Sequence, residues 1–142
     1  MINCKIEGDK LMVEVAIPDQ FLMDVLCTAI ESGYSTEWAR FKNAVTRKGK
    51  HTHEYISVVV EDWGDEDTAQ STKTINLDAL RAALPGLIAG TLKDEKGNDS
   101  NVHETYRQEI LKAIMEDDAG NIDAWRADMI LQAAYFGAVI YG

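Results

Sequence analysis

Apolar and polar residues alternate over residues 2–17, which predicts a β-hairpin at the start of the chain. Gly8 and Asp9 supply the turn chemistry between its two strands. The alternating apolar positions are Ile2, Cys4, Ile6, Val13, Val15 and Ile17. The spacing then changes to three and four residues over residues 18–33, which predicts an amphipathic helix. Pro18 and Asp19 suit its first turn, and Gly33 is expected to end it in a left-handed conformation.

Residues 34–63 predict two further strands joined by a turn at Lys48 and Gly49. The second strand carries apolar residues on both faces around Ile56–Val60, which is typical of a central, covered strand. The acidic, polar stretch 64–72 is expected to be a loop.

The second half of the chain predicts helices. Residues 76–93 form a helix with Asn76 as its N-cap, and Pro85 is expected to kink it or split it. A polar loop leads to an amphipathic helix over 102–117, and the last helix begins at Ile122. We therefore expect one α+β domain over residues 1–142, with a small antiparallel sheet of about four strands packed against a helical C-terminal half.

The last helix is expected to run through "QAAYFGAVIYG" to Gly142. Thirteen residues from Met129 to Tyr141 are apolar apart from Gln132, fewer than the ~20 that span a bilayer. This apolar character on all sides predicts a buried central helix, or a contact with a second subunit in a homo-oligomer. Gly137 is expected to let another backbone approach closely.

The charge is unevenly distributed along the chain. The net charge is −10; residues 1–60 contribute −1 and residues 61–142 contribute −9. Residues 38–53 nevertheless contain five basic residues and no acid. Direct nucleic-acid binding over a large face is unfavourable, because phosphates would meet mostly carboxylates. A basic protein partner, or one small anionic ligand on the basic segment, remains compatible with this distribution.

Catalytic signatures are missing from the sequence. There is no nucleophile elbow, phosphate loop or dinucleotide fingerprint, and the acidic clusters do not follow the calcium-loop pattern. Cys4 and Cys27 are interpreted as small buried thiols in a reducing compartment. His51 and His53 share a strand face and suggest a zinc or manganese site with His103 or an acidic side chain as third ligand, but exposed histidines are the favoured interpretation. We expect no catalytic residue, metal or cofactor, and so no enzyme.

Two groups of residues are candidate binding sites. Trp38 lies beside the basic segment, and an aromatic ring beside cationic groups suits a nucleotide. That ligand set is Trp38, Arg40, Lys42 and Arg47. Core packing is the favoured interpretation for each tryptophan, with Trp125 expected to pack on a neighbouring helix. The acidic strand end is a candidate protein-binding site. It comprises Glu61, Asp62, Trp63, Asp65, Glu66 and Asp67.

The stretches "IPDQFLMDVLCTAIESGYSTEWA" at 17–39 and "ADMILQAAYFGAVIYG" at 127–142 resemble a family of small proteins encoded by tailed phages and prophages. Members carry "IPD…DLLCTALEGG…W" and end in "…FLQLALFGEVVYG"; this chain has Ala138 where an acid is common. The matching positions are Ile17, Pro18, Asp19, Leu26, Cys27, Thr28, Ala29, Glu31, Gly33, Trp38, Leu131, Gln132, Ala133, Phe136, Gly137, Val139, Tyr141 and Gly142.

The resemblance implies a phage or prophage protein acting in the bacterial host cytoplasm, and it transfers no catalytic residue. Small acidic phage proteins often block host defence, as anti-CRISPR proteins do. We therefore expect an inhibitory protein that binds a host factor through its acidic surface. The alternative is a nucleotide-binding sponge that sequesters a defence signalling nucleotide.

Overall fold

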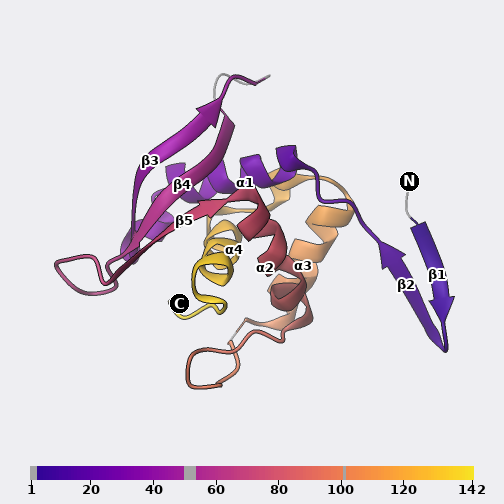
Figure 1. Ribbon diagram of the computed structural model, residues 1–142. Coiled ribbons are helices and arrows are strands. Elements are labelled where there is room, and N and C mark those ends of the chain that lie inside the picture. Colours follow the sequence, from indigo (N-terminus) through magenta and orange to yellow (C-terminus); the bar gives the residue numbers. More distant parts are fainter. Residues whose placement is uncertain (1–2, 50–53, 101) are drawn as a thin grey trace.

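A three-stranded antiparallel sheet packed with helices forms the body of the protein, and a two-stranded hairpin stands beside it (Figure 1). The computed structural model describes residues 3–49, 54–100 and 102–142. The strands are β1 (Asn3–Glu7), β2 (Lys10–Glu14), β3 (Ala39–Arg47), β4 (Glu54–Asp62) and β5 (Ser71–Asn76). The helices are α1 (Asp19–Glu31), α2 (Leu77–Ala89), α3 (Glu104–Met115) and α4 (Ala124–Phe136), with short 3-10 turns η1 (Tyr34–Glu37) and η2 (Ala119–Asn121). The predicted α+β class is confirmed.

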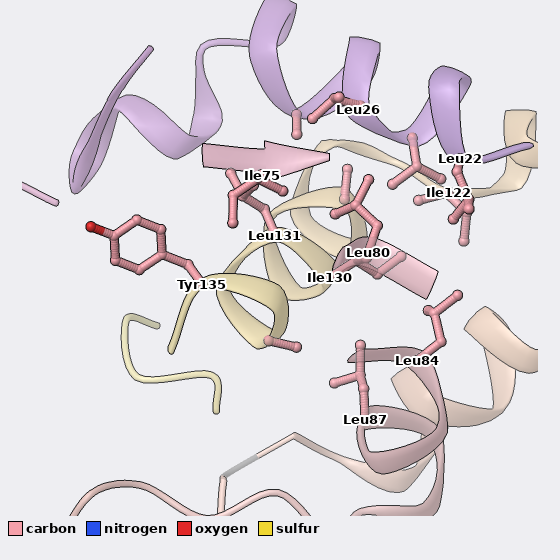
Figure 2. Close-up of a cluster of buried hydrophobic side chains, with 14 of the residues drawn as sticks. Leu22, Leu26, Ile75, Leu80, Leu84, Leu87, Ile122, Ile130, Leu131 and Tyr135 are labelled. Atoms are coloured by element: carbon pink, nitrogen blue, oxygen red, sulfur yellow. The ribbon is translucent and has the colours of Figure 1, made fainter. Parts of the chain in front are cut away.

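The central strand of the larger sheet is β4, as its apolar sequence predicts. Helices cover one of its faces, so Val58 and Val60 are 0 % exposed, whereas Val59 between them is half-buried. The core lies between that face and helices α1, α2 and α4, where leucine and isoleucine side chains interlock (Figure 2). The predicted central position is therefore confirmed, whereas the covering is complete on one face only.

The hairpin β1–β2 has the predicted pairing, with Cys4 opposite Val13 and Ile6 opposite Leu11. Within the described residues it does not pair with the other strands, so the strands there form two separate sheets rather than one. All residues of both strands are exposed. The interpretation of Cys4 as a buried thiol is therefore wrong, because its alternating strand has no core to face.

Strand β5 was not predicted: it begins within the last two residues of the expected loop 64–72 and continues to Asn76. Its sequence, STKTIN, is polar, and only Ile75 is buried, so the pattern gave little sign of a strand. Main-chain pairing with β4 holds it in place, with Ile75 opposite Val58. The predicted cap at the strand's end is confirmed, because the N–H of Ala79 donates to Asn76 Oδ1 at 2.8 Å.

Helix α2 continues through Pro85 from Leu77 to Ala89, so of the two expected effects, a kink or a split, the split does not occur. A proline removes one helical hydrogen bond. Leu80, Leu84 and Leu87, on both sides of it, are each 1 % exposed, and their burial keeps the two halves on one core.

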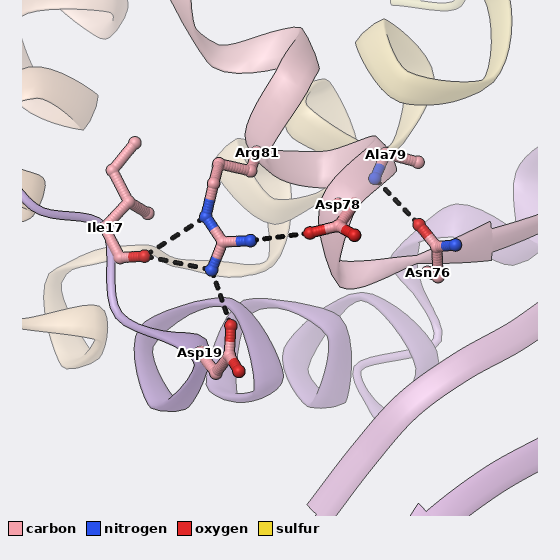
Figure 3. A network of polar contacts seen from close by, with 6 residues as sticks. All are labelled: Ile17, Asp19, Asn76, Asp78, Ala79 and Arg81. Atoms are coloured by element: carbon pink, nitrogen blue, oxygen red, sulfur yellow. Dashed lines mark hydrogen bonds and ion pairs between the residues drawn. The ribbon is translucent and has the colours of Figure 1, made fainter.

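A guanidinium group ties α2 to the start of α1 (Figure 3). Arg81 donates to the carbonyl of Ile17 at 3.3 Å from Nε and at 3.1 Å from Nη2, and it also pairs with Asp19 and Asp78. The segment between the hairpin and α1 is therefore anchored by hydrogen bonds to a charged group.

The last helix ends at Phe136, earlier than its apolar sequence suggests. Gly137 has φ +69° and caps the helix in the left-handed conformation, and residues 138–142 turn away from the helical path. A side chain at Gly137 would meet nothing within 4 Å, so the expected close backbone approach is wrong. Helix α4 is buried within its own chain, so its apolar character needs no second subunit to explain it.

Among the helices of the described residues, none combines the length and apolar character needed to cross a bilayer.

Candidate functional site

A buried carboxylate on α4 binds the segment that follows α1. Asp128, on α4, is 3 % exposed. Its Oδ1 accepts hydrogen bonds from the hydroxyl of Ser35 at 2.6 Å and from the indole N–H of Trp38 at 2.8 Å. Its Oδ2 accepts from the side-chain amide of Gln132 at 2.7 Å. The tryptophan of the first recognisable stretch is thus fixed by the last helix.

Gln132 holds the C-terminal segment against that carboxylate. Its Oε1 accepts from the N–H groups of Ile140 at 2.9 Å and Tyr141 at 2.8 Å, and its Nε2 donates to the Tyr141 carbonyl at 3.0 Å. The Tyr141 ring consequently stacks on Trp38, with 5.7 Å between ring centroids and 15° between planes. The residue that interrupts the apolar run is therefore the one that folds the tail back.

The segment directly after β4 is anchored at the same place. The N–H groups of Trp63 and Gly64 donate to the Trp38 carbonyl at 2.7 and 3.1 Å. The Tyr141 hydroxyl donates to Asp62 at 3.2 Å. Gly64 has φ +51°, and a Cβ there would lie 2.9 Å from the Tyr141 hydroxyl. Loop, tail and η1 therefore meet around one tryptophan.

A pocket of about 240 Å³ opens at this junction. It is lined by Tyr34, Glu37, Trp38, Asp65, Asp128, Tyr141 and Gly142. Glu37 and Asp65 are exposed at its rim, whereas Asp128 and Trp38 form its buried part. The walls are aromatic and the charged lining groups are carboxylates, so the pocket favours a cation over an anion.

The hydroxyl groups of the two tyrosines that line the pocket both have raised pKa values. Partial burial, and then the charges of Asp128 and Glu37, raise the pKa of the Tyr34 hydroxyl. Burial, followed by the charge and hydrogen bond of Asp62, raises the pKa of the Tyr141 hydroxyl.

The six residues of the predicted partner site have different environments. Glu61 pairs with Lys42 at 3.3 Å, and Asp62 is largely buried under Tyr141. The Trp63 ring is half-buried with the Arg40 guanidinium above it, 5.3 Å from the ring centroid.

The three loop acids Asp65, Glu66 and Asp67 are exposed. Among the ion pairs of the described residues, none involves them. We call these three the acidic loop; of the predicted partner site, they are the residues free to meet a partner.

The proposed nucleotide set is not assembled into an open stacking site. Trp38 is 1 % exposed, so its ring offers no free face to a base. Arg40 donates to the carbonyls of Thr36 and Ala39 at 2.7 and 2.9 Å. Lys42 pairs with Glu61 at 3.3 Å, and Arg47 pairs with the Glu54 carboxylate at 3.6 Å.

The histidine hypothesis has no support from the residues that are described. His51 and His53 lie outside them. His103 caps α3, where its Nδ1 accepts from the N–H of Thr105 at 3.1 Å. Within 3–49, 54–100 and 102–142, no three His, Cys, Asp or Glu side chains are grouped so that they could hold a metal ion.

Cys27 is half-buried rather than buried as expected, whereas Trp125 packs on a neighbouring helix as predicted. Burial, and then the neighbouring Glu31, raises the pKa of the Cys27 thiol to about 11, so the thiol stays almost entirely protonated at neutral pH. Trp125 packs on α3, with its ring centroid 4.7 Å from that of Tyr106.

Sequence reasoning missed most of the pocket. Tyr34, Glu37 and Asp128 belong to no motif, and Tyr141 was noticed only for the resemblance of its stretch. An aspartate and a glutamine four residues apart in an otherwise apolar helix were the available signal, because buried polar side chains need partners. Comparison with family models, with curated proteins and with solved structures found no match for the chain.

Proposed function

We propose that this chain is a phage- or prophage-encoded, non-enzymatic binding protein that acts in the bacterial host cytoplasm. It blocks a host factor, such as a component of antiviral defence, by covering a basic surface of that factor. The observation that carries this proposal is the acidic loop Asp65, Glu66 and Asp67, exposed and without ion pairs in the described structure, beside a pocket whose charged lining groups are carboxylates.

The charge distribution supports the same function. Residues 61–142 carry a net charge of −9, which attracts a basic partner over distances of about 10 Å at moderate salt. Complementary charge increases the rate of association and selects against acidic partners. The acidic loop follows directly on Trp63 and Gly64, whose N–H groups are hydrogen-bonded to the Trp38 carbonyl. Its three carboxylates are therefore presented with little ordering cost on binding.

Sequestration of a defence signalling nucleotide has less support. Its aromatic residue, Trp38, is buried, and Lys42 and Arg47 are each paired with a glutamate. A thermal-shift screen with cyclic and linear nucleotides tests it. A ligand at 100 times its dissociation constant adds about 2.7 kcal/mol to the stability of the folded protein, so absence of any shift rejects this alternative.

The binding function is tested by affinity capture from bacterial lysate. The immobilised wild-type chain is expected to retain a basic host protein at low salt and to release it at high salt. The triple variant Asp65→Asn, Glu66→Gln, Asp67→Asn is expected to lose that protein.

A matched triple variant controls for total charge. Glu95→Gln, Glu116→Gln, Asp117→Asn removes the same charge at exposed positions outside the loop, and it is expected to retain the protein. Equal loss in both variants, or no salt-sensitive protein at all, would contradict the proposal.

A further inference from the structure

We infer that the pocket formed by η1, the acidic loop and the C-terminal segment receives the guanidinium group of an arginine side chain of the partner. This inference rests on the proposed function and names the chemical group that the acidic face recognises.

The first observation is a buried charge with no cationic partner in the described structure. Asp128 is 3 % exposed, and its three hydrogen-bond donors, Ser35, Trp38 and Gln132, are neutral. None of the ion pairs among the described residues involves it. A buried carboxylate is costly without a counter-charge, and this one lies in the lining of a pocket that opens to solvent. A cation entering the pocket would supply the missing charge.

The second observation is the arrangement around that carboxylate. Glu37 on η1 and Asp65 in the acidic loop place two more carboxylates at the rim. Tyr34 and Tyr141 supply the accessible aromatic surface, whereas Trp38 lines the pocket as a buried ring. Aromatic faces attract cations through the ring quadrupole. The site therefore combines charge attraction with flat walls, which an exposed group of acids alone does not offer.

The size and chemistry of the pocket exclude two other classes of ligand. Drug-sized ligands occupy roughly 300–1,000 Å³, so a pocket of about 240 Å³ suits the end of one side chain and not a whole nucleotide. A nucleotide phosphate would also face Glu37, Asp65 and Asp128. A metal ion lacks a suitable ligand group among the described residues, because no three potential ligands are arranged to hold one.

Arginine fits this pocket better than lysine. A guanidinium is planar and weakly hydrated, stacks on aromatic rings and offers several donors to separate carboxylates. An ammonium is a strongly hydrated point charge, which loses more hydration energy on entering an aromatic pocket. We therefore expect the pocket to bind an arginine side chain more tightly than a lysine side chain.

The test uses the full chain labelled with ¹⁵N and a peptide with one arginine between glycines. The indole N–H signal of Trp38 is identified by comparison with Trp63→Phe and Trp125→Phe. The arginine peptide is expected to shift this signal in a saturable way, because the indole binds Asp128. The same peptide with citrulline, which is isosteric and uncharged, is expected to cause no shift, and the lysine peptide is expected to bind at least threefold more weakly.

Rim variants locate the site. Glu37→Gln and Asp65→Asn are each expected to weaken the arginine peptide about fivefold, as loss of one partly exposed ion pair does. Asp67→Asn is the matched control, because it removes the same charge from the same loop without lining the pocket, and it is expected to change affinity less than twofold. No shift, equal binding of citrulline or lysine, or equal weakening by Asp67→Asn would overturn the inference.

The two proposals fail in different ways. Capture of a basic host protein that is unaffected by Glu37→Gln, together with no peptide shift, rejects the arginine pocket and leaves the acidic-surface function standing. Selective binding of the arginine peptide, with no salt-sensitive protein retained from lysate, rejects the proposed function and leaves the pocket standing.

Discussion

The indole nitrogen of Trp38 donates a hydrogen bond of 2.8 Å to Asp128, a residue 90 positions further along the chain. This bond joins the turn after α1 to the middle of α4. It also fixes the Trp38 ring in the position where Tyr141 stacks on it. The backbone carbonyl of Trp38 accepts the hydrogen bonds from Trp63 and Gly64, which precede the acidic loop. One buried carboxylate thus organises three segments that are distant in sequence.

Replacement of this carboxylate should destabilise the protein strongly. Asp128→Ala leaves the buried donors of Ser35, Trp38 and Gln132 without an acceptor, so we expect a loss of about 3 kcal/mol in the free energy of unfolding. Asp128→Asn keeps one oxygen for Trp38 but turns an N–H towards the Gln132 amide, so a smaller loss of about 1–2 kcal/mol is expected.

Denaturant unfolding followed by tryptophan fluorescence measures both losses. Asp67→Ala, an exposed loop variant, is the control and should change stability by less than about 0.5 kcal/mol. If Asp128→Ala were as stable as this control, the carboxylate would not organise the fold.

The C-terminal segment should be indispensable. Deletion of residues 136–142 removes the rings of Phe136 and Tyr141 from Trp38 and removes the backbone N–H donors bound to the side-chain oxygen of Gln132. We therefore expect loss of soluble, folded protein. A truncated chain that stays in solution with unchanged mass in light scattering would contradict this.

A point substitution tests the same contact without truncation. Gln132→Ala breaks the bonds to Ile140 and Tyr141 and leaves Asp128 with one donor fewer, so unfolding should need about 2–3 kcal/mol less. Gln20→Ala removes an exposed glutamine amide and serves as its control. Equal stability of the two variants would show that the tail does not depend on Gln132.

The sequence predicted an element correctly where the residues that determine it lie within or next to that element, and not where contacts with distant segments determine it. Helix α1 was predicted correctly because its signals are local: the apolar spacing lies within the helix, and Gly33, with φ +78°, follows its C-cap Ser32. Strand β5 was missed because main-chain pairing with β4 holds a polar segment in place. The apolar pattern of the tail was extended into a helix past Gly137, the local signal at which the helix ends. The return of the tail had no local signal, because nothing nearby in sequence shows that Gln132 accepts hydrogen bonds from the backbone of residues 140 and 141.

The candidate site was predictable only in part, for the same reason. The acidic loop was visible as a charge cluster, and Asp65 proved to line the pocket. Tyr34, Glu37 and Asp128 come together only when η1, the loop and α4 have folded, so no spacing in the sequence connects them. Trp38 was noticed for its basic neighbours, whereas its environment is determined by a carboxylate on another helix.

The end of α4 should depend on the backbone freedom of one residue. Gly137 has φ +69°, and a Cβ there would meet nothing, so the cost of a substitution is conformational and not steric. We expect Gly137→Ala to lower the free energy of unfolding by about 1 kcal/mol. Gly137→Asn should cost less, because asparagine tolerates the left-handed region better than alanine does.

Thermal and chemical denaturation of the two Gly137 variants provides the comparison. An asparagine variant less stable than the alanine variant would show that the space around residue 137, rather than its dihedral angle, determines the cost.

The two cysteines should differ in reactivity towards a thiol reagent. Burial raises the pKa of Cys27 to about 11, so at pH 8 only about one Cys27 thiol in a thousand is the reactive thiolate. Cys4 is exposed on the hairpin and should react at the rate of an ordinary accessible thiol. Because a raised pKa keeps the thiol protonated below it, the Cys27 rate should increase about tenfold per pH unit from pH 8 towards pH 10, while the protein remains folded.

Colorimetric thiol titration of Cys4→Ser and Cys27→Ser separates the two rates: the first variant should show only the slow phase and the second only the fast one. A Cys27 rate that is fast at pH 8 and insensitive to pH would mean that this helix position is open to solvent and not shielded beside Glu31.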